Sequence, residues 1–171
     1  RQNVAAHHGG AIDVRVQSLE LVIITNCAFL ENTAFYEGGA IKTIGRVFVG
    51  TSDFIRNTTA TCCGRGGAVH GNWEVEHCSF FDNEAENGGA LYRSFSGQPV
   101  ADCLFHGNTA TEQGGAIFFW STQDDATVAG CVFEDHAAES GAAVAALNGG
   151  DVVVSESSFC GNAPDDLIGT W

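Results

Sequence analysis

Apolar residues recur along the chain with a period of about 26 residues. Six phenylalanines follow one another at spacings of 25, 26, 25, 28 and 26 residues, namely Phe29, Phe54, Phe80, Phe105, Phe133 and Phe159. Five residues before each of them stands Ile or Val: Ile24, Val49, Val75, Val100, Val128 and Val154. A near-constant period in this range indicates one structural unit stacked on copies of itself.

Two short motifs alternate within this period. The first is Gly-Gly-Ala followed by Ile, Leu or Val. It begins at Gly9, Gly38, Gly66, Gly88 and Gly114 and returns in degenerate form at Gly141. The second is Phe-x-x-Asn, with its asparagines at Asn32, Asn57, Asn83, Asn108 and Asn162 and His136 in the remaining position. Asn tolerates the left-handed backbone of a corner, and its amide can bond to the same amide one coil away.

Each period predicts three short strands. One ends at the Ile/Val column, one carries the Phe, and one contains Gly-Gly-Ala with the following apolar residue turned inward. Three strands per period without helical periodicity predict a right-handed, single-stranded parallel β-helix of about six coils. We expect residues 1–171 to form one solenoid segment, with the Phe and Asn residues in stacked ladders and the Ala of each Gly-Gly-Ala facing outward.

Length and charge narrow the function classes. The chain has 171 residues and a net charge of −14, with 7 basic against 21 acidic side chains. Nucleic-acid binding is disfavoured, because phosphate contacts require a basic face. No apolar run approaches the roughly 18 residues that a membrane-spanning helix needs, so we expect no membrane insertion. Because the chain starts at Arg1 inside a repeat, we expect a piece of a longer polypeptide.

The alternation of Gly-Gly-Ala-[Ile/Leu/Val] with Phe-x-x-Asn resembles the repeat region of the chlamydial polymorphic outer-membrane proteins and of related surface β-helix proteins. The resemblance covers nearly the whole chain. It implies a passenger-like β-helix that is extracellular or exposed on a cell surface, with adhesion attributed to the repeats. No residue of this chain matches a C-terminal translocator barrel.

A column of small residues lies two positions before each Phe. It contains Cys78, Cys103 and Cys131 in consecutive coils, for which packing in the core is the leading interpretation. Parallel Cβ directions disfavour disulfides between coils. Adjacent Cys62 and Cys63 lie in the one lengthened loop, where they are candidates for a vicinal disulfide or for a cross-link to another segment.

A candidate binding surface lies on the outer face of the Gly-Gly-Ala strand. The residue after the inward Ile, Leu or Val gives the column Asp13, Lys42, His70, Tyr92, Phe118 and Ala145. Tyr92, Phe118 and Trp120 are expected to form an exposed aromatic stripe beside Arg93. Such a stripe suits a sugar ring or a partner protein, and the competing expectation is that side loops cover it.

Catalytic residues are not apparent. The adjacent acidic pairs are Asp124-Asp125, Asp165-Asp166 and, at a corner, Glu134-Asp135. Asp124-Asp125 lies in a loop with no recurring His or Arg partner in neighbouring coils. No cofactor is expected. The acidic charge makes a divalent cation such as calcium an option, although no ligand motif supports one and no metal site is predicted. The sequon at Asn57 belongs to the Asn column and is expected to be buried.

Three functional hypotheses remain. The first is a non-enzymatic extracellular stem, adhesin-like or a structural segment of a surface appendage. The second is a polysaccharide-active enzyme, a lyase or a glycoside hydrolase, on the same scaffold; a cluster of acidic and basic side chains across two or three coils would favour it. The third is an assembly subunit. The expected partners are protein segments or subunits at open helix ends, and carbohydrate or a cell-surface protein.

Overall fold

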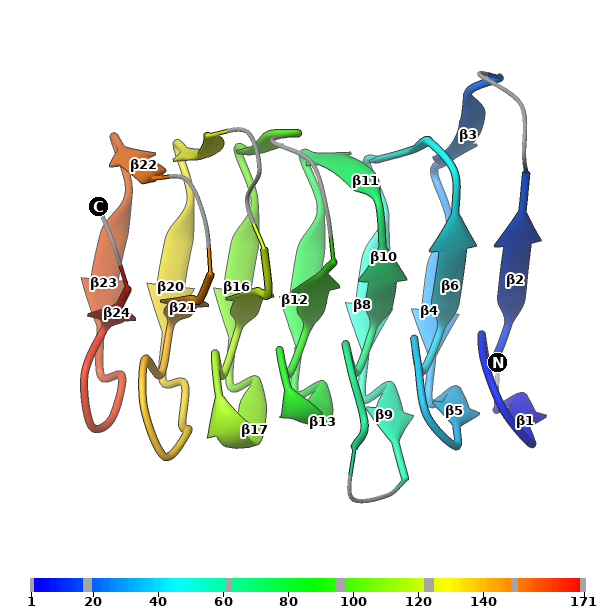
Figure 1. The fold of residues 1–171 in the computed structure, drawn as a ribbon, viewed down its shortest axis with the longest axis horizontal. Coiled ribbons are helices and arrows are strands. Elements are labelled where there is room, and N and C mark those ends of the chain that lie inside the picture. The colour runs from blue at the N-terminus through cyan, green and yellow to red at the C-terminus, as the bar shows by residue number, and fades with distance from the viewer. Residues whose placement is uncertain are drawn as a thin grey trace.

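Four parallel sheets make up the regular structure. The computed structural model describes residues 2–16, 20–60, 63–94, 98–121, 125–148 and 151–169. In these ranges every regular element is a strand, and every strand pairs in parallel with its equivalent one coil away. Figure 1 shows these coils side by side along the long axis. The parallel β-helix of about six coils is therefore confirmed.

The sheets are named here after their sequence motifs. The GGA sheet contains β2 (Ile12–Arg15), β6 (Ile41–Ile44), β10 (Val69–Gly71), β14 (Leu91–Arg93), β18 (Ile117–Phe119), β21 (Val144–Ala146) and β24 (Leu167–Ile168). The Val sheet contains β3 (Val22–Thr25), β7 (Val47–Gly50), β11 (Trp73–Glu76), β15 (Val100–Ala101), β19 (Ala126–Ala129) and β22 (Val152–Ser155).

The other two sheets flank the Asn corner. The Phe sheet contains β4 (Ala28–Leu30), β8 (Asp53–Ile55), β12 (Ser79–Phe81), β16 (Leu104–His106), β20 (Val132–Glu134) and β23 (Ser158–Cys160). The Thr sheet contains β1 (Val4–Ala5), β5 (Thr33–Ala34), β9 (Thr58–Thr59), β13 (Glu84–Asn87) and β17 (Thr109–Gln113).

The Thr sheet corrects the expected strand count, because most described coils have four strands and not three. Its strands begin directly after the ladder Asn, and Thr58 N donates to Asn32 O at 2.9 Å across the coils. The first three strands of this sheet are two residues long, with the sequences Val-Ala, Thr-Ala and Thr-Thr. A segment so short and weakly apolar leaves no periodic signal in the sequence.

The outward orientation expected for the Ala of Gly-Gly-Ala is also wrong. Ala40 and its equivalents Ala68, Ala90 and Ala116 are buried in the main core. The reason is a local irregularity, since Ala40 N and Ile41 N both donate to Ala68 O at 2.9 Å. Two successive amides that share one carbonyl bend the backbone, so strand alternation starts only at Ile41.

The Gly-Gly pair is required by the backbone. Gly38 has a φ of +62°, which favours glycine. A Cβ on Gly39 would stand 2.0 Å from Gly67 O of the next coil. The pair therefore forms a sharp turn where successive coils approach too closely for any side chain.

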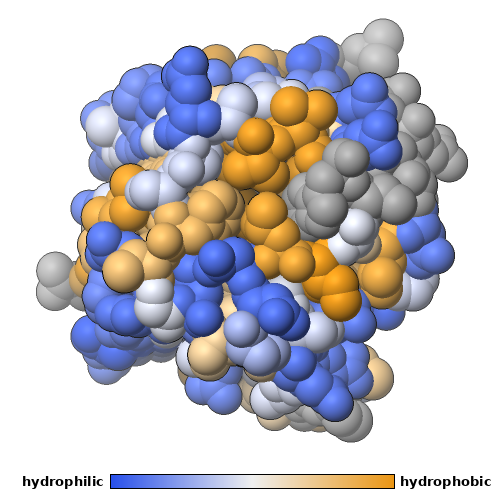
Figure 2. Space-filling model, turned by 90° about the vertical axis from the view of Figure 1, so that its left-hand side faces the viewer, coloured by the Kyte–Doolittle hydropathy of each residue, from blue (hydrophilic) through white to orange (hydrophobic). Residues whose placement is uncertain are grey.

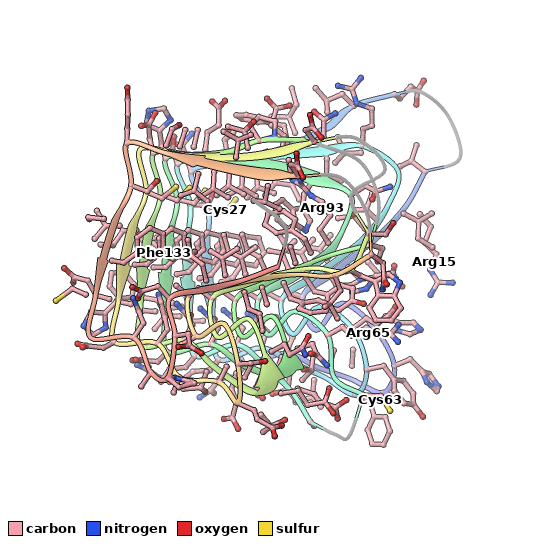
Figure 3. All side chains as sticks on the ribbon, turned by 60° about the vertical axis from the view of Figure 1, so that its left-hand side comes forward. Arg15, Cys27, Cys63, Arg65, Arg93 and Phe133 are labelled. Atoms are coloured by element: carbon pink, nitrogen blue, oxygen red, sulfur yellow. The ribbon has the colours of Figure 1, made fainter. Side chains whose placement is uncertain are left out.

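The phenylalanines form a stack through the interior (Figure 3, around Phe133). Successive rings from Phe29 to Phe133 have centroids 4.8 Å apart and interplanar angles of 3–8°. This separation matches the spacing of hydrogen-bonded strands, so each ring packs on the next without distorting the sheet.

The asparagines bond to one another along the same axis. The Nδ2 atom of Asn32 donates to Oδ1 of Asn57 at 2.8 Å, and Asn57 and Asn83 repeat the contact to the next coil at 3.0 and 2.9 Å. Each acceptor Oδ1 also receives the backbone N–H of the preceding Asn. The amides are thus satisfied although buried, and burial of Asn57 closes the sequon.

His136 interrupts these amide contacts. Its Nδ1 accepts from Asn108 N at 3.0 Å, in the place that an Asn Oδ1 takes in the other coils. Burial lowers the pKa of His136 to about 4, because the charged ring would lose its hydration. The imidazole is therefore neutral at physiological pH.

Replacing Phe80 by Ala is expected to lower the free energy of unfolding by about 3–5 kcal/mol, because it opens a cavity in the middle of the stack. Denaturant unfolding of Phe80→Ala measures this loss. Phe35→Ala is the matched control, since Phe35 is 42% exposed and should cost less than about 1 kcal/mol. A cost below about 1 kcal/mol at Phe80 would contradict a buried stack.

His136→Asn is expected to reduce acid sensitivity. In the wild type, the unfolded chain binds a proton at His136 near the ordinary pKa of 6.5, whereas the folded chain binds it only near 4. Stability at this site is therefore lost as pH falls from about 6.5 to 4. The variant should gain about 1–3 kcal/mol over the wild type across this window, measured by denaturant unfolding at several pH values. Parallel pH profiles would contradict the assignment.

Candidate functional site

Two columns of side chains run next to each other on the outside of the GGA sheet. The first is the in-register column Asp13, Lys42, His70, Tyr92, Phe118 and Ala145. The second is formed by the residues directly before each glycine pair, which pair in parallel between coils: His8, Glu37, Arg65, Asn87, Gln113 and Ser140. The Gly-Gly turn brings the two columns together, and the surface between them is called the GGA groove.

Glu37 is at the centre of the polar end of this groove. Its carboxylate lies 2.5 Å from Lys42 Nζ, 3.4 Å from His8 Nδ1 and 3.6 Å from Arg65 Nη1. His70 Nε2 lies 3.7 Å away. Four side chains from three coils thus surround one carboxylate.

The protonation of this cluster follows from burial and neighbouring charge. Burial and then the charge of Lys42 lower the pKa of His70 to about 3. Neutral His70 accepts from Lys42 Nζ at Nδ1 (3.2 Å), which assigns the proton to Nε2, 3.3 Å from Ser94 Oγ. Burial alone would raise the pKa of Glu37, but neighbouring charge and the hydrogen bond from Lys42 outweigh it and lower the pKa. At neutral pH Glu37 is therefore ionised and ion-paired.

Sequence reasoning missed Glu37. Adjacent acidic pairs were the expected sign of a site, whereas three of the four partners of Glu37, namely His8, Arg65 and His70, come from neighbouring coils. The available signal was its position: the residue before each Gly-Gly is polar in every coil.

The aromatic end of the groove differs from the expected exposed stripe. Tyr92 and Phe118 are only 3% and 2% exposed, so their expected exposure was wrong, whereas Trp120 is 46% exposed. The Arg65 guanidinium lies 5.5 Å from the Tyr92 ring centroid, and Leu147 packs against the same cluster. Tyr92 and Phe118, with ring centroids 5.1 Å apart, form the floor, and Trp120 stands 6.3 Å from Phe118.

Arg93 does not belong to this surface. It lies inside the coil, where strand alternation places it after inward Leu91 and outward Tyr92 (Figure 3). Its guanidinium lies 4.2 Å from the Trp73 ring and 5.2 Å from the Phe119 ring. One nitrogen donates to Trp73 O at 2.9 Å, while Nε and Nη1 have no hydrogen-bond partner among the described residues. Burial lowers the pKa of Arg93 to about 9.

Comparison with known protein families identifies one repeat. Residues 102–119 match the family model of the Chlamydia polymorphic membrane protein repeat. The matched segment runs from the Phe105/Asn108 motif through Gly114 to Phe118, and confirms the resemblance seen in the motifs. The search of curated proteins and the search of solved structures each found no match.

The matched segment includes one member of the Cys column, Cys103. Cys78, Cys103 and Cys131 are buried thiols in consecutive coils. The flanking thiols of Cys131 and Cys78, together with burial, raise the pKa of Cys103. Cys62 and Cys63 were candidates for a vicinal disulfide or a cross-link, and Cys62 lies outside the described residues.

Members of the adjacent acidic pairs that the structure describes make local hydrogen bonds. Asp166 accepts from Asn162 Nδ2 at 2.8 Å, and Asp125 accepts from the Asp151 backbone at 3.3 Å. Asp124 lies outside the described residues. Over the part of the chain that the structure describes, no group of three or more His, Cys, Asp or Glu side chains is arranged to hold a metal, and no helix is long and apolar enough to cross a membrane.

Glu37→Gln is expected to lower the free energy of unfolding by about 1–3 kcal/mol at neutral pH, because buried Lys42 loses its counter-charge. The contribution of Glu37 is present above about pH 4.5 and is lost as pH falls through its lowered pKa. The gap to wild type should therefore narrow in acid. Glu139→Gln, at an exposed carboxylate, is the control and should change stability by less than about 0.5 kcal/mol. Equal costs for the two variants would contradict a central role for Glu37.

Proposed function

We propose that this chain is a non-enzymatic stem of an extracellular or cell-surface protein, adhesin-like, that binds partners along the GGA groove. The observation that carries the proposal is a contrast between columns. The Phe stack keeps one residue type through six coils, whereas both columns of the groove change at every coil. Constant columns maintain a scaffold, whereas a variable column that reaches the surface, as the second column does, suits recognition.

The match to the polymorphic membrane protein repeat supports the proposed location. Repeats of this family belong to surface proteins of the chlamydial outer membrane, and here one such repeat lies within a continuous β-helix. A cell-surface or secreted location is the simplest setting for such a segment.

The proposed partners at the helix axis are further coils, either of the same polypeptide or of a neighbouring subunit. Figure 2 views the molecule from the end with β22 and β23, where apolar side chains occupy the middle of the face. Val154, Phe159 and Leu167 are only partly buried there. Coils of the same period would cover these residues and extend the four sheets.

A polysaccharide-active enzyme is the second candidate, and one observation favours it. Glu37, Lys42, Arg65 and His70 form the mixed acidic and basic cluster across coils that would indicate catalysis. The arrangement nevertheless suits structure better, because Glu37 already faces four partners. Glycoside hydrolysis generally uses two carboxylates about 5–10 Å apart, and this cluster supplies one.

Electron microscopy of the native protein at side-chain resolution tests the proposal. We expect ordered coils stacked on both ends of the segment, with the GGA groove open to solvent. An isolated β-helix with covered ends, together with release of reducing or unsaturated sugars from acidic polysaccharides, would overturn it in favour of the enzyme. Loss of that release in Glu37→Gln would then place the activity in the cluster.

A further inference from the structure

A depression of about 290 Å³ lies in the aromatic end of the GGA groove, lined in part by Asn87, Glu112, Gln113 and Trp120. We propose that this depression, the Trp120 pocket, binds a neutral sugar ring; the inference rests on the proposed function and names the ligand class of its groove.

Trp120 provides the apolar side of the pocket. Its indole is the exposed member of a cluster in which Phe118 and Tyr92 are buried underneath. The contact with Phe118 and the backbone bond from Trp120 N to Arg93 O (2.9 Å) tie the residue to the coil. An indole held in place in this way can pack against the C–H face of a pyranose, which is apolar and about as large and flat as the indole.

Donors and acceptors together form the polar rim. Asn87 Nδ2 donates to Glu112 Oε2 at 2.8 Å, which links side chains from two coils. The bond uses one amide hydrogen and one carboxylate oxygen, so each side chain keeps further hydrogen-bonding capacity, and the Gln113 amide adds a donor and an acceptor. Sugar hydroxyls both donate and accept, and amides next to a carboxylate match that chemistry.

Charge selects against anionic ligands. Two carboxylates, those of Glu86 and Glu112, line the pocket together with one guanidinium, that of Arg65. Arg65 is already engaged with the Tyr92 ring and with Glu37. A uronate or phosphate group would therefore meet net negative charge, on a chain whose total charge is −14. The competing ligand is a small organic cation, which would use the indole and the carboxylate but not the amides.

The experiment is saturation-transfer NMR and titration of the chain with methyl glycosides of glucose, galactose, mannose and N-acetylglucosamine. We expect saturable binding of at least one of them with a Kd on the order of 1 mM. Trp120→Ala should weaken that binding about tenfold or more. Phe35→Ala, at an exposed ring outside the pocket, should leave it unchanged.

A second variant separates sugars from cations. Glu112→Gln keeps the acceptor for Asn87 and should weaken sugar binding by less than about fivefold, whereas binding of a cation should fall about tenfold or more. Tetramethylammonium chloride is the cation probe. Absence of saturable sugar binding, equal affinity in Trp120→Ala, or stronger binding of tetramethylammonium than of any glycoside would each overturn the inference.

The proposed function and the proposed sugar pocket can be rejected independently of each other. A surface stem seen by electron microscopy without sugar binding would reject the Trp120 pocket and leave the stem. Sugar binding by a protein that is neither a stem nor at the surface would reject the proposed function and leave the pocket.

Discussion

The structure depends on in-register parallel pairing between identical positions of successive coils. Each residue then lies one strand spacing from its own equivalent, so a side chain that packs well on a copy of itself is favoured in every coil. Flat Phe rings, 4.8 Å apart, and Asn amides that both donate and accept meet that condition. The same constraint makes the column the unit of both stability and function.

This constraint explains how much the sequence reveals. The period and the recurring Phe and Asn are enough for the parallel β-helix and its coil number, because a repeated column is visible without structure. The backbone conformation between the columns could not be predicted in this way. The bend that turns Ala40 inward arises from a carbonyl shared by two amides, and the two-residue strand at Thr58–Thr59 has no apolar pattern.

The groove was only half predictable for a related reason. The column through His70 and Tyr92 followed from strand alternation, but its exposure did not. Exposure depends on the neighbouring column, where Arg65 lies over Tyr92 and Glu37 pairs with Lys42. The second column consists of the residue directly before each Gly-Gly. The Gly-Gly turn brings the two columns together, and the sequence alone does not show the geometry of that turn.

Arg93 shows the limit of reading charge as exposure. Alternation from Leu91 already directs it inward, yet a guanidinium suggests a surface position. Two aromatic faces, those of Trp73 and Phe119, compensate part of the lost hydration, although burial still lowers the pKa of Arg93 to about 9. A parallel coil can hold such a residue because the four sheets satisfy the backbone independently of it. The pairing of the strands therefore fixes the register, whereas the residue type at a given position can differ from coil to coil. The same freedom on the outside lets the groove change from charged to aromatic residues over a few coils.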